Sequence, residues 1–297
     1  SRVNSSIREP SRYPSFGKLA LKKWQSKDLE VNILFFGDIV GKIGRDVFFA
    51  ELPRLKRKFS PDLIIVNGEN SANGRGITSK IYHHFLDEGV HCITSGNHVF
   101  DNKEILPHLR NCPALIRPIN YPEVTPGIRI FTTLLGGTKV AVVSVMGQVF
   151  MPPIDNPFHA LETLLKNDLQ TFPVIIVDFH AEATSEKLAF GLHFAGRVSA
   201  VIGTHTHVQT ADAEILNSHT GYITDVGMSG AKHAILGMEP SAVLRRFLTS
   251  LPEKLSPPEE DTQGILDYVF MEISSAGQAS SIQAFHEIVD LEFYVVK

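Results

Sequence analysis

Two histidines, His205 and His207, are separated by one threonine in the segment GTHTHVQTAD, directly after the apolar run SAVI. If the strand that SAVI predicts continues through them, both imidazoles point to the same face of a sheet and converge on one spot. Imidazole groups bind metal ions and transfer protons near neutral pH, so the pair is a candidate for either chemistry. With 13 histidines in 297 residues, chance can produce such a pair, and the other strand ends must decide what it does.

Four other predicted strands also end in polar side chains, after the runs NILFF, DLIIV, HCIT and VIIVDF. Together with the histidine pair they provide seven candidate metal ligands: Asp38, Glu69, Asn70, Asn97, His180, His205 and His207. Taken singly, such residues more often serve as helix caps, turn residues or core groups. Because open α/β sheets place ligands at the carboxyl ends of their strands, the joint arrangement indicates one functional site.

The chemical types of these side chains indicate which ions the site would hold. Carboxylate, amide and imidazole ligands suit iron, manganese or zinc, and the absence of thiolates from the set argues against a structural zinc site. Seven ligands are too many for one tetrahedral ion. Two ions that share a bridging carboxylate would use them all, and two ions roughly 3.5 to 4 Å apart stabilise in-line displacement at phosphorus.

Strand-like and helical patterns alternate along most of the chain and must position these ligands. Besides the strands above, the sequence predicts strands at 139–145 and 222–225 and helices at 45–59, 79–88 and 158–169. The strand-like runs are apolar along their whole length, which is typical of strands that are buried on both faces. This pattern predicts an α/β fold in which helices cover the sheet.

The two ends of the chain differ from this alternation. Residues 1–30 are rich in Ser, Arg and Lys and lack the apolar core of a secretory signal, so we interpret them as an extension and residues 31–297 as one domain. Towards the other end, GILDYVFMEI and SIQAFHEIVDLEF flank the turn signal SSAGQAS. This arrangement predicts an antiparallel hairpin that completes or flanks the core sheet.

Composition excludes several classes of protein. A formal net charge of -4 and a pI near 6.3 give no basic footprint for extended nucleic acid, although a single nucleotide needs only a local site. No apolar run reaches the roughly 18 residues that span a bilayer, so we expect no membrane segment. The two cysteines, Cys92 and Cys112, suggest neither a disulfide framework nor a zinc cluster, which favours a reduced cytoplasmic setting.

The motifs GDIVG, NGENSANGRGI, GNHVFD, DFHAEATSEK, GTHTHVQTAD and ITDVGMSG resemble those of the YmdB-like branch of the calcineurin-type metallophosphoesterases. The resemblance covers nearly all of the chain beyond the N-terminal extension. It implies a four-layer α/β/β/α sandwich and a centre of two metal ions, iron foremost, with manganese and zinc as alternatives. It also implies phosphodiesterase activity on cyclic nucleotides, notably 2′,3′-cyclic and also 3′,5′-cyclic ones, and it is consistent with a homo-oligomer.

Carried over by motif, the family's roles assign Asp38, Asn70 and His207 to the first ion. Asn97, His180 and His205 would hold the second ion, and Glu69 would bridge the two. His98, beside Asn97, would be the acid that protonates the leaving oxygen. The expected mechanism is in-line attack on phosphorus by a hydroxide that bridges the ions, and imidazole is suited to the proton transfer because it titrates near neutral pH.

The chain departs from the wider superfamily in two motifs. The first motif of the superfamily is usually Asp-x-His, and here Val40 stands two residues after Asp38. The bridging residue is usually Asp, and here it is Glu69, followed by Asn70. Both substitutions match the YmdB-like branch. They leave the identity of the metal open, because an amide oxygen is a harder ligand, in the hard–soft sense, than the imidazole it replaces at the first site.

Several further residues and functions remain as alternatives. Arg75 and Arg117 are candidates for contacting substrate phosphate, although a loop arginine is more often structural. Glu182, Thr184 and Glu186 follow His180 and could orient ligands, but we favour the interpretation that they begin a helix. The same site would also serve a phosphomonoesterase or a nuclease. A non-catalytic, metal-dependent nucleotide sensor or scaffold is the alternative from outside the enzymes.

Overall fold

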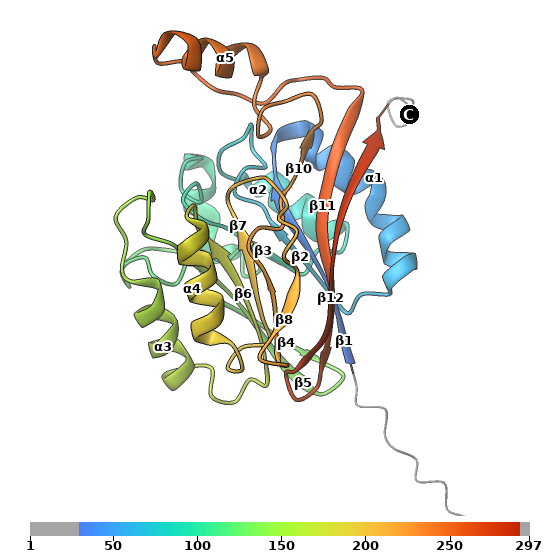
Figure 1. Cartoon of the computed structure of the whole chain (residues 1–297), viewed down its shortest axis with the longest axis vertical. Coiled ribbons are helices and arrows are strands. Elements are labelled where there is room, and N and C mark those ends of the chain that lie inside the picture. The colour runs from blue at the N-terminus through green and yellow to red at the C-terminus, as the bar shows by residue number, and fades with distance from the viewer. Residues whose placement is uncertain (1–29, 292–297) are drawn as a thin grey trace, which may run out of the picture.

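The computed structural model describes residues 30–291. The interpretation of residues 1–30 as an extension therefore falls outside the described part of the chain, except for Glu30. Within that part, strands and helices alternate, and two six-stranded sheets form the centre of the molecule with helices outside them (Figure 1). The chain thus has a mixed α/β fold built on two sheets.

The first sheet has the strand order β12-β11-β10-β1-β2-β3. Its strands are β1 (Glu30–Ile39), β2 (Leu63–Asn67), β3 (Cys92–Thr94), β10 (Met228–Ala231), β11 (Gln263–Ser274) and β12 (Ala279–Asp290). β1 pairs in parallel with β2 and β10, and β2 pairs in parallel with β3. β11 and β12 form the antiparallel hairpin that the sequence predicts, and β11 also pairs with β1.

The second sheet has the strand order β4-β5-β6-β7-β9-β8. Its strands are β4 (Ile130–Leu135), β5 (Thr138–Met146), β6 (Val174–His180), β7 (Ala200–Thr204), β8 (Glu214–Leu216) and β9 (Thr220–Ile223). The four central strands are parallel, whereas β4 and β8 pair antiparallel at the edges. The last residues of β6 and β7, His180 and Thr204, are register partners.

The described residues form five α-helices and one 3₁₀ helix, and all but the last α-helix pack on the outer faces of the two sheets. They are α1 (Gly41–Phe59), α2 (Ser79–Asp87), the 3₁₀ helix Lys103–Asn111, α3 (Pro157–Asn167), α4 (Thr184–Phe194) and α5 (Pro240–Thr249). α3 and α4 lie on one side of the molecule and α1 on the other, while α5 projects at the top of the view (Figure 1). No helix between residues 30 and 291 is both long and apolar enough to cross a membrane.

The three predicted helices form, with ends that differ by up to four residues from those predicted. α3 has Asn156 as its N-cap and Pro157 in its first turn, a position that suits proline. The helix predicted at 45–59 begins earlier, at Gly41. Val40 precedes this start and makes no side-chain cap. The sequence therefore carries no cap signal for the first turn of α1.

Alternate residues of each central strand point into different hydrophobic cores. Leu34 and Phe36 of β1 pack with α1 and α2, whereas Ile33 and Phe35 point into the core between the sheets. A third core lies between the second sheet and helices α3 and α4. Both faces of the strands are buried, which explains why the strand sequences are apolar throughout.

Close backbone packing at the end of β7 requires glycine at position 203. A Cβ at Gly203 would lie 1.7 Å from Thr224 O, whereas a Cβ at Gly221 on β9 would meet its nearest side chains at 3.7 Å. We therefore expect Gly203→Ala to lower the free energy of unfolding by about 1–3 kcal/mol, because backbone must move, and Gly221→Ala to have little effect. Urea unfolding of both variants checks this, and equal losses would contradict it.

Candidate metal centre

One group of predicted ligands gathers around Asp38, near the end of β1. The Asp38 carboxylate is fully buried, and its Oδ1 accepts a hydrogen bond from Asn70 Nδ2 at 2.9 Å. His207 Nε2 lies 3.2 Å from Asn70 Nδ2 and 3.5 Å from Asp38 Oδ1. We call Asp38, Asn70 and His207 the Asp38 cluster.

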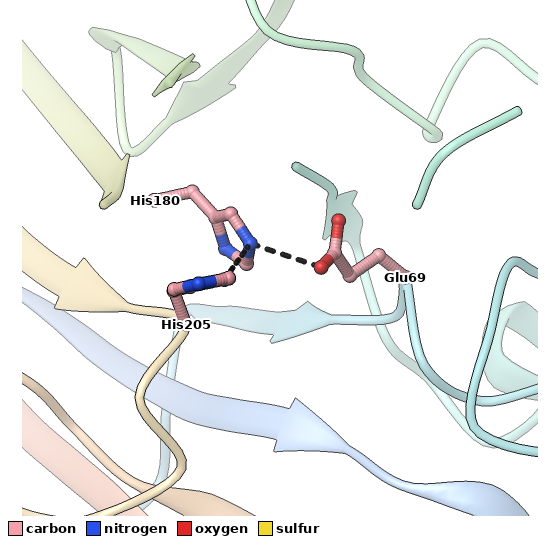
Figure 2. Close-up of side chains that lie close together, drawn as sticks. All are labelled: Glu69, His180 and His205. Atoms are coloured by element: carbon pink, nitrogen blue, oxygen red, sulfur yellow. Dashed lines mark hydrogen bonds and ion pairs between the residues drawn. The ribbon is translucent and has the colours of Figure 1, made fainter. Parts of the chain in front are cut away.

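A second group gathers around His180, the last residue of β6. Its Nε2 lies 2.9 Å from Glu69 Oε1, 3.0 Å from Asn97 Oδ1 and 3.0 Å from His205 Nδ1. Figure 2 shows the side chains of Glu69, His180 and His205 pointing toward one another. We call these four residues the His180 cluster.

The two clusters are neighbours where the parallel strands of both sheets end. The backbone N–H of His205 donates a hydrogen bond to Asp38 Oδ2 at 3.1 Å, which joins one cluster to the other. The structure thus brings all seven predicted ligands into one buried region. They divide into the same two groups, with Glu69 in the second, that the family resemblance assigns to two ions.

The histidine pair does not lie on one face of a continued strand, so that expectation is wrong. β7 ends at Thr204, and His205 and His207 both have positive φ angles, of 101° and 64°. The chain therefore turns sharply after its last ladder pair. As a result the two rings separate, with His205 in the His180 cluster and His207 in the Asp38 cluster.

Hydrogen bonds beneath the clusters set the tautomer of His180. The Thr204 hydroxyl donates its proton to Asp178 Oδ1 at 2.6 Å. The lone pair of the same hydroxyl oxygen therefore accepts a hydrogen bond from His180 Nδ1 at 2.8 Å. A neutral His180 protonated at Nδ1 has an unprotonated Nε2. The Nε2 lone pair then faces the other atoms of the His180 cluster, as a metal ligand requires.

The donor atoms of both clusters fit metal ions. Glu69 Oε1 is fully buried against His180 Nε2, and a buried carboxylate oxygen is costly unless a proton or a cation neutralises it. In the Asp38 cluster, a half-turn of the Asn70 amide would present its oxygen instead of its nitrogen. Oxygen and imidazole donors without thiolate suit iron, manganese or zinc. The residues therefore fit the kind of ion that the sequence predicts.

Without a cation, protons on the imidazoles balance the buried carboxylates. Burial lowers the pKa of His180, but the charges of Glu69 and Asp38 outweigh it and raise that pKa to about 9. Burial also lowers the pKa of His207, and Asp38 again outweighs it and raises that pKa. Burial and the charge on His180 lower the pKa of His205 to about 3. Two of the three histidines thus hold protons at sites where cations would bind.

Glu69 faces His180 with one of its two carboxylate oxygens. Its Oε1 faces His180, and its Oε2 accepts the backbone N–H groups of Gly96 and His98. These contacts fix the carboxylate at the end of β2. The role of Glu69 as a bridge between two ions stays a prediction.

The predicted acid, His98, lies beside the His180 cluster and is partly exposed. Its backbone N–H donates to Glu69 Oε2 at 3.1 Å, and its Nδ1 lies 2.7 Å from Asp101 Oδ2. The Asp101 carboxylate holds Nδ1 in its protonated form and leaves Nε2 for another partner. This arrangement is the one that a general acid needs, with one nitrogen oriented and the other available.

The two arginines predicted to contact substrate take different places. Arg75 is exposed, whereas only 2% of Arg117 is exposed. The Arg117 guanidinium donates to the carbonyl oxygens of Pro118 at 2.8 Å and Thr125 at 3.0 Å. These bonds use the guanidinium to hold its own loop, and they favour the structural interpretation for Arg117.

The interpretation of Glu182 as a helix-starting residue is wrong. Helix α4 begins at Thr184, and Glu182 Oε2 instead lies 3.1 Å from His205 Nε2. Glu186 is in the first turn of α4, as that interpretation requires, and its carboxylate accepts the N–H groups of Gln148 and Val149. Glu182, in the segment between β6 and α4, is therefore in contact with a predicted ligand and can orient its ring.

A layer of buried polar side chains lies beneath the His180 cluster, and the sequence patterns above did not predict it. Asp178 accepts hydrogen bonds from Asn67, Thr94 and Thr204, which come from three other strand ends. Burial raises the pKa of Asp178 to about 6. A sequence signal existed, since an aspartate inside the otherwise apolar run VIIVDF needs partners if it is buried.

Comparison with known proteins places the chain in a family. The model of the family described as YmdB-like protein matches residues 34–285. This chain belongs to that family. The match covers both sheets and all seven ligand positions.

Relatives of the chain include a named phosphodiesterase and two solved structures. The chain is 48% identical over 232 residues to the 2′,3′-cyclic-nucleotide 2′-phosphodiesterase of Bacillus subtilis (strain 168), a match that covers 78% of this chain and 88% of the relative. A crystal structure described as a novel phosphatase from Mycoplasma pneumoniae has a TM-score of 0.83 and 33% identity, over 91% of this chain and 97% of that one. A hypothetical protein from Thermus thermophilus has a TM-score of 0.81 and 37% identity, over 87% of this chain and 99% of that one.

The separation of the two rings predicts different effects of the two histidine substitutions. We expect His205→Ala and His207→Ala each to retain about one tightly bound ion per chain, because each removes a nitrogen ligand from a different cluster. The double variant should retain none, and His193→Ala on α4 should bind like the wild type. Elemental analysis after dialysis checks this. A double variant that retains as much metal as either single variant would show that both rings serve one ion.

The pKa of His180 predicts that metal binding releases protons. Because that pKa is about 9 in the metal-free protein, the proton on His180 competes with an ion at neutral pH. Metal affinity should therefore fall as the pH falls below 9, by about tenfold per pH unit for each proton displaced. Calorimetric titration in buffers of different ionisation enthalpy counts the released protons. Binding at pH 7 without proton release would contradict the assignment.

Proposed function

We propose that the protein is a dinuclear metal-dependent phosphodiesterase that hydrolyses cyclic nucleotides, with 2′,3′-cyclic nucleotides as the main class and 3′,5′-cyclic ones as a second. The observation that carries the proposal is the pair of adjacent ligand clusters, joined by the bond from His205 N to Asp38 Oδ2. The name of the Bacillus subtilis relative supports the substrate class. The ligand types favour iron, with manganese or zinc as alternatives.

The fold supports the same proposal. Helices outside two face-to-face sheets agree with the four-layer α/β/β/α sandwich that the resemblance implies. The clusters lie at the carboxyl ends of the parallel strands, where α/β proteins bind their ligands. A substrate phosphate would therefore approach from the side of the strand ends, between the loops that follow β3 and β7.

Different residues would bind the two ions. Asp38, Asn70 and His207 would hold one ion, and Asn97, His180 and His205 would hold the other. When bound, two ions supply a water of lowered pKa for in-line attack and neutralise charge on the phosphoryl oxygens. Glu69 would contact both ions and keep their separation fixed.

His98 supplies the proton that the leaving group needs. Asp101 fixes its Nδ1, so Nε2 is the atom that would protonate the leaving 2′ or 3′ oxygen of the ribose. Its backbone N–H donates to Glu69 Oε2 at 3.1 Å, so the residue lies beside the His180 cluster. A proton donor beside the two clusters supports the proposed role of His98.

A panel of substrates tests the reaction class. Purified protein of known metal content should hydrolyse 2′,3′-cyclic AMP faster than 3′,5′-cyclic AMP, and both faster than p-nitrophenyl phosphate. The reverse order would favour a phosphomonoesterase, and cleavage of single-stranded RNA or DNA alone would favour a nuclease. Protein that binds metal and cyclic nucleotide but never turns it over would show a sensor or scaffold.

The role of His98 predicts a defined loss of activity. His98→Ala should lower kcat by about 10²–10⁴, because no other group protonates the leaving oxygen, and it should leave the metal content unchanged. His193→Ala, which removes a surface imidazole paired with Glu162, is the matched control. Steady-state kinetics and elemental analysis check both variants. Full activity in His98→Ala would rule out the acid assignment.

A further inference from the structure

The turn that carries the two histidine ligands is conformationally strained. His205 and His207 have φ angles of 101° and 64°, a region that residues other than glycine rarely adopt. Such positions persist only when the surrounding structure holds them. The question is therefore which groups hold residues 204 to 207 in this shape.

A buried ion pair lies directly beneath the turn. Lys187 on α4 is only 1% exposed, and its Nζ donates to Thr204 O at 2.7 Å and to Asp225 Oδ2 at 2.6 Å. Asp225 is fully buried, and the same Oδ2 accepts the backbone N–H of Thr206 at 3.0 Å. The pair thus binds the backbone on both sides of His205, through the carbonyl before it and the amide after it.

The same carboxylate also reaches the strand that carries Asp38. Asp225 Oδ1 accepts the N–H of Gly227 at 2.9 Å. The carbonyl oxygen of Gly227 in turn accepts the N–H of Asp38 at 3.1 Å. One buried carboxylate therefore connects the histidine turn of the second sheet to the aspartate ligand of the first sheet.

We propose that Lys187 and Asp225 are positioning residues that hold the histidine turn and β1 in the geometry that lets both clusters bind metal. The proposal rests on the metal centre proposed above. Neither side chain is a ligand, and each acts through backbone groups of ligand residues or of their neighbours. The ammonium of Lys187 pairs with Asp225, so the buried carboxylate has a cation beside it and accepts two backbone N–H groups.

A purely structural role would also explain why the pair is buried, so the two roles must be separated. Replacing both members of a buried ion pair by uncharged residues of similar shape often has little effect on stability, whereas removing one member leaves an unpaired buried charge. The positioning role depends on the two N–H groups that Asp225 accepts. An asparagine at this position has one acceptor oxygen and can satisfy only one of them.

The test compares Lys187→Met, the double variant Lys187→Met/Asp225→Asn, and Leu161→Ala as a control. Leu161 is a residue of α3 that is fully buried in the core between α3 and the second sheet. Its truncation destabilises the fold at a site away from the turn. Thermal unfolding measures stability, and calorimetric titration with Mn²⁺ measures metal affinity. Hydrogen exchange of the Thr206 amide in metal-free protein reports directly on the turn.

We expect the double variant to regain most of the stability lost in Lys187→Met. It should still bind Mn²⁺ about 10- to 100-fold more weakly than the wild type and exchange the Thr206 amide faster. Leu161→Ala should lose stability with unchanged affinity and exchange. If affinity and exchange instead recover together with stability in the double variant, the pair is only structural and the proposal is wrong. Wild-type protein that binds no Mn²⁺ would overturn the metal centre, and the Thr206 exchange rate would still decide whether the pair orders the turn.

Discussion

The rest of this structure depends on one constraint. Carboxylate and imidazole groups are buried together with their lone pairs facing one another. Asp38 and Glu69 are fully buried at the ends of neighbouring strands, and His180, His205 and His207 surround them. Such a set is costly unless cations or protons neutralise it. In the metal-free protein, protons on His180 and His207 serve that purpose. Bound ions would replace those protons and use the same geometry for phosphoryl chemistry.

The backbone around the site is arranged to bring these groups together. Gly37 and Gly203 allow strands to approach so closely that a Cβ at either position would overlap a carbonyl oxygen. The histidine turn adopts positive φ angles that cost free energy on their own. Asp178 and Asp225 lie beneath the ligands and bind the backbone and side chains that orient them. The apolar cores on both faces of the sheets stabilise the fold and offset the free-energy cost of the strained turn.

Sequence patterns predicted the parts of the fold that depend on local order. Apolar strands, the terminal hairpin and the helix predicted at 158–169 each carry their signal in a few adjacent residues. The division into two sheets does not, since parallel pairing joins residues far apart in the chain. The proximity of the seven candidate ligands could be predicted because each follows a recognisable strand. The turn at His205 and the contact from Glu182 could not, because both depend on how segments pack in three dimensions.

The first motif illustrates how this family departs from the wider superfamily that it resembles. Val40 stands where a histidine is usual and is buried, and the Asn70 amide lies beside Asp38 and His207 in the Asp38 cluster. The central claim is that the two clusters hold two separate ions. Anomalous X-ray diffraction from crystals of the Mn²⁺-loaded protein tests this claim most directly. We predict two peaks, one among Asp38, Asn70 and His207 and one among Asn97, His180 and His205, whereas a single peak shared by both histidines of the turn would contradict the account.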